Sequence, residues 1–131
     1  MPADAYLSAI VTILAMLLFT WMGIRVGRMR GKHGIKAPAM TGHPEFERAV
    51  RVHMNTLEGL AVFLPALWLT TIYLDARIAA ALGAIWIVGR VVYMQGYMRE
   101  ADKRGLGFGI AGIVNIVLIL TSIAGVAMTA I

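Results

Sequence analysis

The amino-acid sequence predicts an all-α protein: an integral membrane bundle of four antiparallel helices. Three observations support this prediction. Hydrophobic residues make up 60% of the 131 residues and the mean hydropathy is +0.77, a composition too apolar for a water-soluble fold. Four apolar stretches follow one another, each suited to a hydrocarbon core that needs about 20 helical residues to cross. Basic residues gather mostly in the connections between these stretches.

The distribution of charged residues along the chain places the four spans. The first is uncharged over residues 5–24, and Asp4 precedes it where a signal peptide would have a basic segment. The second begins among charged residues, because its uncharged part is too short to cross the bilayer alone. The connection "YLDAR" (73–77) is short and makes the second and third spans antiparallel neighbours. The spans are expected at residues 5–25, 47–73, 78–104 and 107–130, in one domain covering residues 1–131.

Charge in the connections predicts the orientation of the chain. The first and third connections are basic, whereas Arg77 in the second is offset by Asp75, and the N-terminus is acidic. Because cytoplasmic loops are enriched in lysine and arginine, both basic connections are expected in the cytoplasm. We expect a bacterial inner membrane with both termini in the periplasm. The basic residues are Arg25, Arg28, Arg30, Lys32, Lys36 and Arg48 in the first connection, and Arg99, Lys103 and Arg104 in the third.

Net charge and cysteine content bear on function. A net charge of +5 raises the question of nucleic-acid binding. The basic residues border apolar spans, however, and form no surface stripe with interleaved aromatic residues, so nucleic acid is not expected as a partner. The chain has no cysteine, which excludes disulfides and means that any thiol chemistry depends on a thiol brought by a substrate.

A polar stripe marks the start of the second span, within "PEFERAVRVHMNTLEGL" (44–60). Arg51, Asn55 and Glu58 are spaced i, i+4, i+7 and share one helix face. If Arg51 lies at the membrane interface, Glu58 lies about 10 Å deeper, where a lone carboxylate costs roughly 2.5 to 3.5 kcal/mol. Two interpretations remain open: a structural ion pair between Glu58 and Arg90 of the third span, or a ligand-binding face. His53 lies about 200° from Arg51 around the helix and points elsewhere.

The third span carries a second polar stripe, within "GRVVYMQGYMREADKRG" (89–105). If this helix continues through residue 104, Arg90, Tyr93, Tyr97 and Arg104 all face one side. The tyrosines alone are also typical of an interfacial aromatic belt, and the cations of topology signals. Taken together, the two stripes suit a small polar anion with one amine: arginines for carboxylates, a glutamate for an ammonium group and hydroxyls for orientation.

Three stretches resemble the family of membrane-associated proteins in eicosanoid and glutathione metabolism (MAPEG), in particular its leukotriene C synthase and microsomal glutathione transferase branch. They are "TGHPEFERAVRVHMNTLE" (41–58), "YMQGYMR" (93–99) and the pair Lys103–Arg104. The resemblance implies a four-helix bundle assembled as a homotrimer, with glutathione as co-substrate between adjacent subunits and no metal. It also implies that Arg51, Asn55, Glu58, Tyr93, Tyr97 and Arg104 bind glutathione from one subunit, and Arg30 and His53 from its neighbour.

The sequence departs from the family pattern at three places. Position 59 is glycine instead of an aromatic residue, and position 53 is histidine instead of glutamine. The segment "GLGFGI" follows Arg104 in place of a longer polar connection, so the position of Arg104 is open and Lys103 is an alternative for its role.

The resemblance implies thiol chemistry. An ordinary thiol, with a pKa of about 8.5, is about 3% thiolate at pH 7. An opposite charge nearby lowers such a pKa by roughly 1 to 3 units, so a guanidinium from Arg104 makes thiolate, the nucleophile, the major species. The expected function is a membrane-bound glutathione transferase, with glutathione peroxidase activity as a further expectation. Its co-substrates are lipophilic electrophiles or lipid hydroperoxides that arrive from the bilayer.

Two other functions remain as alternatives. A non-catalytic lipid-binding member of the same family is one alternative, although the retained arginines and tyrosines argue against it. A small four-helix proton-coupled drug exporter is another. Such an exporter is expected to carry a carboxylate in its first span, and residues 5–24 contain none.

Overall fold

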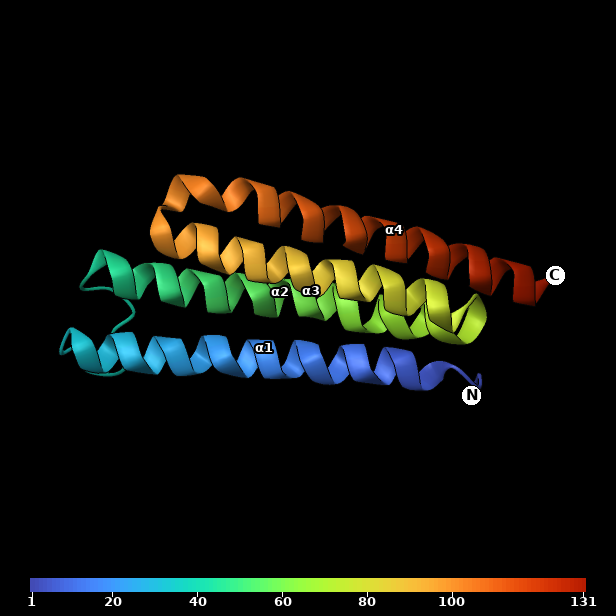
Figure 1. Ribbon diagram of the computed structural model, residues 1–131, viewed down its shortest axis with the longest axis horizontal. Helices are drawn as coiled ribbons and strands as arrows, with labels where there is room; N and C mark the ends of the chain where they lie inside the picture. The colour runs from blue at the N-terminus through green and yellow to red at the C-terminus, as the bar shows by residue number, and fades with distance from the viewer.

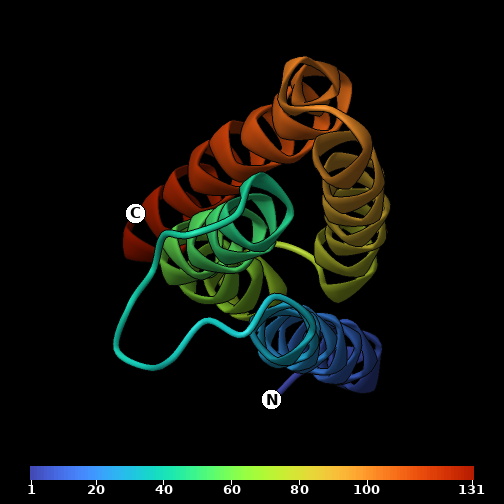
Figure 2. The ribbon, with the colours of Figure 1, turned by 90° about the vertical axis from the view of Figure 1, so that its left-hand side faces the viewer.

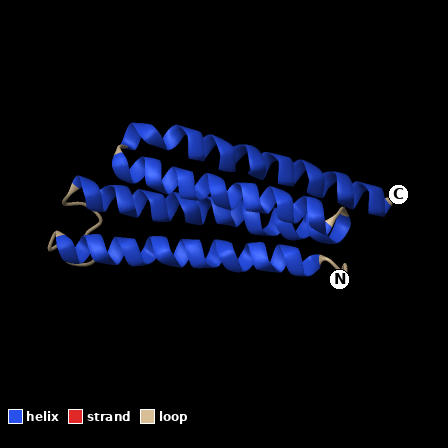
Figure 3. Ribbon diagram, in the orientation of Figure 1, coloured by secondary structure: helices blue, strands red, loops and turns tan.

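The computed structural model describes all residues, 1–131, and is helical throughout apart from short connections (Figure 3). Each of its four long helices is long and apolar enough to cross a membrane. The predicted all-helical fold with four spans is therefore confirmed. The elements are α1 (Ala5–Lys32), α2 (Pro44–Tyr73), α3 (Ala76–Arg99), a short 3-10 helix η1 (Ala101–Arg104) and α4 (Gly105–Ala130).

The four helices run side by side along the long axis of the molecule (Figure 1). Both termini and the α2–α3 turn lie at one end. The α1–α2 connection (33–43) and η1 lie at the other, which we call the loop end. The end-on view in Figure 2 shows α1 and α4 on opposite sides of α2, and α2 contacts all three other helices. Consecutive helices along the chain therefore run in opposite directions, as four antiparallel spans require.

Side-chain caps explain where α2 and α3 begin. His43 Nδ1 accepts a hydrogen bond from the backbone N–H of Glu45 at 3.1 Å, and Pro44 occupies the first helical turn. A proline there is favourable because its φ angle suits the helix and the first N–H groups have no partner within it. Helix α2 thus starts at Pro44, before the expected residue 47. At α3, Asp75 Oδ1 accepts from the backbone N–H groups of Arg77 and Ile78 at 2.8 and 2.9 Å.

The third helix ends at Arg99, so the prediction of one continuous helix through residue 104 is wrong. The chain instead reverses through η1, and α4 begins at Gly105. Two close approaches accompany this reversal. A side chain at Gly96 would collide with the backbone carbonyl of Lys103, and one at Gly107 would collide with the backbone of Tyr93. Because glycine carries no Cβ, the two helices pack backbone to backbone immediately beside the turn.

Small residues and hydroxyl groups hold the bundle together. Ser8 and Thr71 share a hydrogen bond of 2.7 Å between α1 and α2, and Thr70 and Thr121 share one of 2.9 Å between α2 and α4. Lipid is as apolar as a leucine side chain, so close packing and hydrogen bonds of this kind contribute to helix association in membranes. The buried centre includes Phe63 and Trp86, whose rings stack with centroids 4.0 Å apart.

Candidate functional site

Arg90 joins α2 to α3 in the loop half of the bundle. Its side chain is buried, with 3% of the residue exposed. Nη2 donates hydrogen bonds to Asn55 Oδ1 at 2.9 Å and to Thr56 Oγ1 at 2.8 Å. The guanidinium carbon also lies 4.1 Å from the ring centroid of Tyr93, a distance at which the ring face attracts a cation. Arg90 therefore fixes Asn55 and Tyr93, two of the predicted ligand residues, relative to each other.

The structure does not form the ion pair between Glu58 and Arg90 that was one interpretation of the sequence. The four ion pairs of the chain involve other residues, and Arg90 bonds to neutral oxygens of α2 instead. Glu58 remains exposed in the single chain. Asn55 Oδ1 and Thr56 Oγ1, on the side of Glu58 toward the start of α2, accept both hydrogen bonds of Arg90 Nη2 and hold the guanidinium there. The carboxylate of Glu58 is left without a cation.

Tyr93, Tyr97 and Arg104 come together although the helix ends between them. The rings of Tyr93 and Tyr97 have centroids 5.6 Å apart, and the guanidinium carbon of Arg104 lies 5.7 Å from the Tyr97 ring centroid. Arg104 Nη1 donates to the carbonyl oxygen of Ala101 at 2.9 Å, within η1. The tight reversal of the chain thus returns Arg104 to the tyrosine face by a different route from the one predicted.

We call Asn55, Arg90, Tyr93, Tyr97 and Arg104 the polar cluster. Arg51 and Glu58 lie on its exposed side. Both side chains are exposed and neither takes part in an ion pair of the chain. Two opposite charges without partners therefore flank Asn55 on the same helix. Helices α2 and α3 and the short helix η1 carry all the residues that were expected to bind glutathione from one subunit. These are Arg51, Asn55, Glu58, Tyr93, Tyr97 and Arg104.

Arg30 and His53 make separate contacts within their own chain. Arg30 Nη1 donates to the carbonyl oxygen of Ala39 at 2.7 Å, which holds the α1–α2 connection to the end of α1. His53 is half-buried and stacks on Phe19 of α1 with ring centroids 4.4 Å apart. Gly23 provides the space for this ring, since a Cβ there would lie 3.2 Å from His53 Nε2. The guanidinium carbon of Arg30 also lies 4.8 Å from the ring centroid of Phe46 in α2. None of these contacts involves Arg90 or Tyr93.

A cavity of about 280 Å³ opens between α2, α3 and α4 next to the cluster. Asn55, Glu58 and Arg90 border it, and so does Asn115 of α4. Asn115 was missed by the sequence analysis. Its Nδ2 donates to the carbonyl oxygen of Gly59 at 3.3 Å. The sequence feature that could have indicated Asn115 is its polar side-chain amide within a span that carries no charge.

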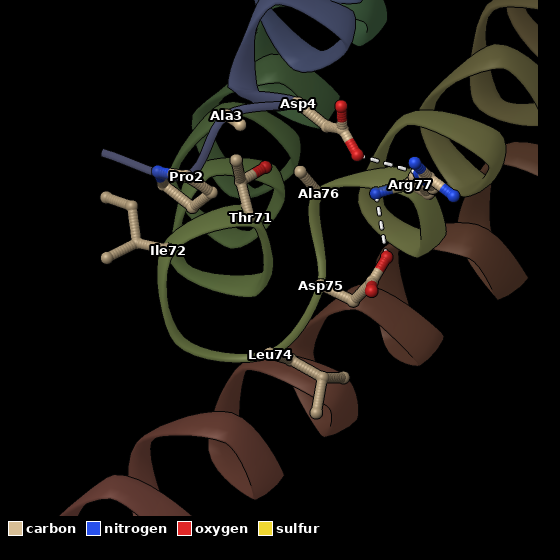
Figure 4. A pocket seen from close by; sticks show the side chains of 9 residues that line it. All are labelled: Pro2, Ala3, Asp4, Thr71, Ile72, Leu74, Asp75, Ala76 and Arg77. Atoms are coloured by element: carbon tan, nitrogen blue, oxygen red, sulfur yellow. Dashed lines mark hydrogen bonds and ion pairs between the residues drawn. The ribbon is translucent and has the colours of Figure 1, made fainter.

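A second hollow, of about 200 Å³, lies at the opposite end of the bundle and contains none of the predicted site residues (Figure 4). There Arg77 Nε donates to Asp4 Oδ2 at 2.7 Å and ties the start of α1 to the start of α3. Figure 4 shows this ion pair beside the cap formed by Asp75. No cluster of three or more histidine or carboxylate side chains suitable for a metal occurs in the chain.

Fold and site together define an integral membrane protein of four helices whose second and third spans carry a polar cluster near one end of the bundle. Residues 8–124 match the MAPEG family, and the chain belongs to that family. The family resemblance drawn from the sequence motifs is thereby confirmed.

Several relatives have names that indicate an activity. Mouse microsomal glutathione S-transferase 2 is 40% identical over 128 residues, which cover 97% of this chain and 86% of the relative. Leukotriene C4 synthase of the guinea pig, Cavia porcellus, is 36% identical over 104 residues, 79% of this chain and 69% of the relative. A Synechocystis protein, sll1147, is 46% identical over 118 residues, 90% of this chain and 86% of the relative, and is described as uncharacterized.

Proposed function

We propose that this protein is a membrane-bound glutathione transferase, with glutathione peroxidase activity toward suitable substrates. The observation that carries the proposal is the pair of unpartnered opposite charges, Arg51 and Glu58, exposed on a helix suited to cross a membrane. Such charges are costly in a bilayer and mark functional sites by default. The relatives named as a glutathione transferase and a leukotriene C4 synthase add support at the level of the family.

Glutathione offers the groups that this cluster is equipped to bind. It has two carboxylates, one ammonium group and one thiol. Arg51 pairs with a carboxylate, for which a planar guanidinium is well suited. Glu58 pairs with the ammonium group. Asn55 and the hydroxyls of Tyr93 and Tyr97 provide orienting hydrogen bonds. The charges of Arg51 and Glu58 are both satisfied in this arrangement.

Glutathione is proposed to lie between subunits of a homotrimer. Arg51, Asn55, Glu58, Tyr93, Tyr97 and Arg104 act from one subunit, and Arg30 and His53 from the adjacent one. The position of Arg30 at the α1–α2 connection and the contact of His53 with α1 support this division, because neither contact involves Arg90 or Tyr93 of the same chain.

Arg104 is proposed to activate the thiol. Its guanidinium lies over Tyr97 at the loop end, where it is accessible to a bound peptide. If its charge lowers the pKa of the glutathione thiol by about two units, the thiolate fraction at pH 7 rises from about 3% to about three-quarters. Lys103, also exposed, is the alternative source of this charge. No residue of the chain has to act as a nucleophile, because glutathione supplies the sulfur.

The transfer step then needs only proximity and a good electrophile. The thiolate sulfur attacks an electrophilic carbon, a C–S bond forms and the leaving group departs with its electron pair. A lipophilic co-substrate reaches the sulfur from the bilayer. We place the protein in a bacterial inner membrane, with the basic loop end in the cytoplasm and both termini in the periplasm.

The decisive experiment is a titration of the purified protein in detergent with glutathione, read by the ultraviolet absorbance of the thiolate. Saturable thiolate formation at neutral pH is expected, with conjugation of chlorodinitrobenzene in the same preparation. A well-folded protein that shows neither signal contradicts the proposal. Lipid binding without thiolate formation favours the non-catalytic lipid-binding role instead.

A further inference from the structure

A continuous stripe of side chains follows one face of α1 from the apolar part of the helix toward its basic end. The members recur at spacings of three and four residues, so they lie within about 80° of one another around the helix. All are exposed except Arg25, which is half-buried. The stripe, which we call the α1 stripe, consists of Ile10, Leu14, Leu17, Trp21, Arg25 and Arg28. It therefore changes from aliphatic to aromatic to cationic along the helix.

The α1 stripe lies on a different face from the one that packs in the bundle. Helix α1 is at the edge of the molecule (Figure 2), in contact with α2 and α3. Its buried residues include Val11, Ala15 and Met22, which lie about 80° to 120° from Trp21 around the helix. Arg30, which is proposed to act across the subunit interface, lies about 180° from Trp21. The stripe is therefore open to lipid in the single chain, and the proposed homotrimer does not require it to be covered.

The two arginines of the stripe have no anionic partner in the chain. Neither takes part in an ion pair, and neither donates any of the side-chain hydrogen bonds that arginines make in this protein. Lys32, the next cation on this face, differs because its Nζ lies 2.8 Å from Oε1 of Glu45. Arg25 and Arg28 are spaced i, i+3, so their like charges are neighbours on the helix and repel each other. An anion bound between them removes this repulsion.

The contact between Trp21 and Arg28 holds one of these charges close to the apolar span. The guanidinium carbon of Arg28 lies 5.1 Å from the ring centroid of Trp21, although the two residues are about 10 Å apart along the helix axis. The two side chains therefore lean toward each other, and Arg28 does not extend away from the membrane as a snorkelling side chain does. Tryptophan in a spanning helix is typical of the level of the lipid headgroups. The positive charge of Arg28 is thus held at that level.

We propose that the α1 stripe is a binding site for an anionic phospholipid. The phosphate lies between the guanidinium groups of Arg25 and Arg28, whose planar sets of donors suit phosphate oxygens. One acyl chain runs along Leu17 and Leu14 toward the middle of the bilayer. The apolar residues continue directly from the cations on the same face, which favours a lipid over a free anion. A zwitterionic phospholipid is bound less tightly, because the cation of its headgroup is repelled by the two arginines.

This inference is independent of the proposed function, since no residue of the proposed glutathione site belongs to the α1 stripe. It also differs from the use of basic residues as topology signals. A topology signal depends on the number of cations in a connection, whereas the lipid site requires these two arginines at these positions beside Trp21.

The test uses two phospholipids that differ only in the headgroup, dioleoyl phosphatidylglycerol and dioleoyl phosphatidylcholine. Their binding to the purified full-length protein in detergent is measured by native mass spectrometry. The wild type is expected to bind the anionic lipid about 10- to 30-fold more tightly, because each of two arginines favours an anionic headgroup. The double variant Arg25→Gln with Arg28→Gln is expected to lose this preference. Lys36→Gln with Arg99→Gln is the matched control, since it removes the same charge from two exposed residues outside the stripe and should keep the preference.

A second measurement locates the lipid without changing the arginines. In mixed liposomes, phosphatidylglycerol with brominated acyl chains is expected to quench the tryptophan fluorescence of the wild type more than brominated phosphatidylcholine does. Trp21→Phe should remove this difference, because the remaining tryptophans, Trp68 and Trp86, lie outside the stripe.

Four outcomes overturn the inference. The first is equal affinity of the wild type for the two lipids, which is the result expected if a second copy of the chain covers the stripe. The second is an equal loss of preference in both double variants, which makes the effect one of net charge. The third is a quenching difference that survives in Trp21→Phe, which places the lipid elsewhere. The fourth is competition by the water-soluble headgroup glycerophosphoglycerol at the affinity of the intact lipid, which makes the ligand a free phosphate ester.

Discussion

The guanidinium of Arg104 lies over the ring of Tyr97, with its carbon 5.7 Å from the ring centroid, although α3 ends at Arg99 between them. The two side chains meet because the chain reverses through η1 rather than continuing as a helix. The turn at η1 thereby holds the positive charge of Arg104 near Tyr93 and Tyr97. This relationship makes Arg104 the first residue to test.

Arg104→Leu is expected to raise the pH at which bound glutathione ionises, since it removes the positive charge that is proposed to stabilise the thiolate. Conjugation at pH 7 should fall about 10- to 30-fold, in line with a pKa change of one to two units. The thiolate absorbance measured across a pH series checks both statements. Lys103→Leu is the neighbouring control. If Lys103→Leu raises the ionisation pH and Arg104→Leu does not, Lys103 is the activating residue.

Arg90 and Glu58 are expected to respond differently to substitution because the structure leaves them unpaired with each other. Arg90→Leu removes two interhelical hydrogen bonds, one part-buried to Asn55 and one buried to Thr56, and should destabilise the bundle by about 1 to 3 kcal/mol. Glu58→Gln removes only an exposed charge, so stability should be unchanged while glutathione affinity falls. Unfolding in graded denaturing detergent and glutathione titration separate the two effects. A Glu58→Gln variant with unaltered affinity contradicts the assignment of Glu58 to the ligand.

The fold was predictable because membrane spans depend on local composition. Apolar runs of sufficient length identify four helices without knowledge of their neighbours. The stripe of Arg51, Asn55 and Glu58 was predictable for the same reason, since all three lie on one helix and the helical period alone places them on one face.

Relations between helices were not predictable in this way. The partners of Arg90 depend on the relative depth of α2 and α3, which no single-helix pattern contains. Arg104 reaches Tyr97 through a reversal that depends on the close approach of Gly107 to the backbone of Tyr93. Asn115 borders a cavity that exists only where α2, α3 and α4 meet, which no single-helix pattern contains.

Gly107→Ala tests whether this close approach positions the cluster. A Cβ at residue 107 collides with the backbone of Tyr93, so α4 must move away from α3. Lower thermal stability and weaker glutathione binding are expected together. Gly109→Ala is the matched control on the same helix, because nothing lies within 4 Å of a Cβ there. It should be neutral or stabilise the helix by up to about 1 kcal/mol. Equal behaviour of the two variants contradicts the positioning role of Gly107.

Assembly of the site from two subunits can be tested by mixing inactive variants. Arg30→Ala and Arg104→Leu each remove one side of the proposed intersubunit site, so the proposed homotrimer of either variant alone should bind glutathione poorly. In a ring of subunits with head-to-tail interfaces, random co-assembly gives about a quarter of interfaces with both side chains intact. Co-expression should therefore restore a corresponding fraction of thiolate formation, whereas mixing separately purified trimers should restore none. If co-expression restores nothing while mixed trimers are recovered by two affinity tags, Arg30 and Arg104 act within the same subunit and the proposed division of the site is wrong.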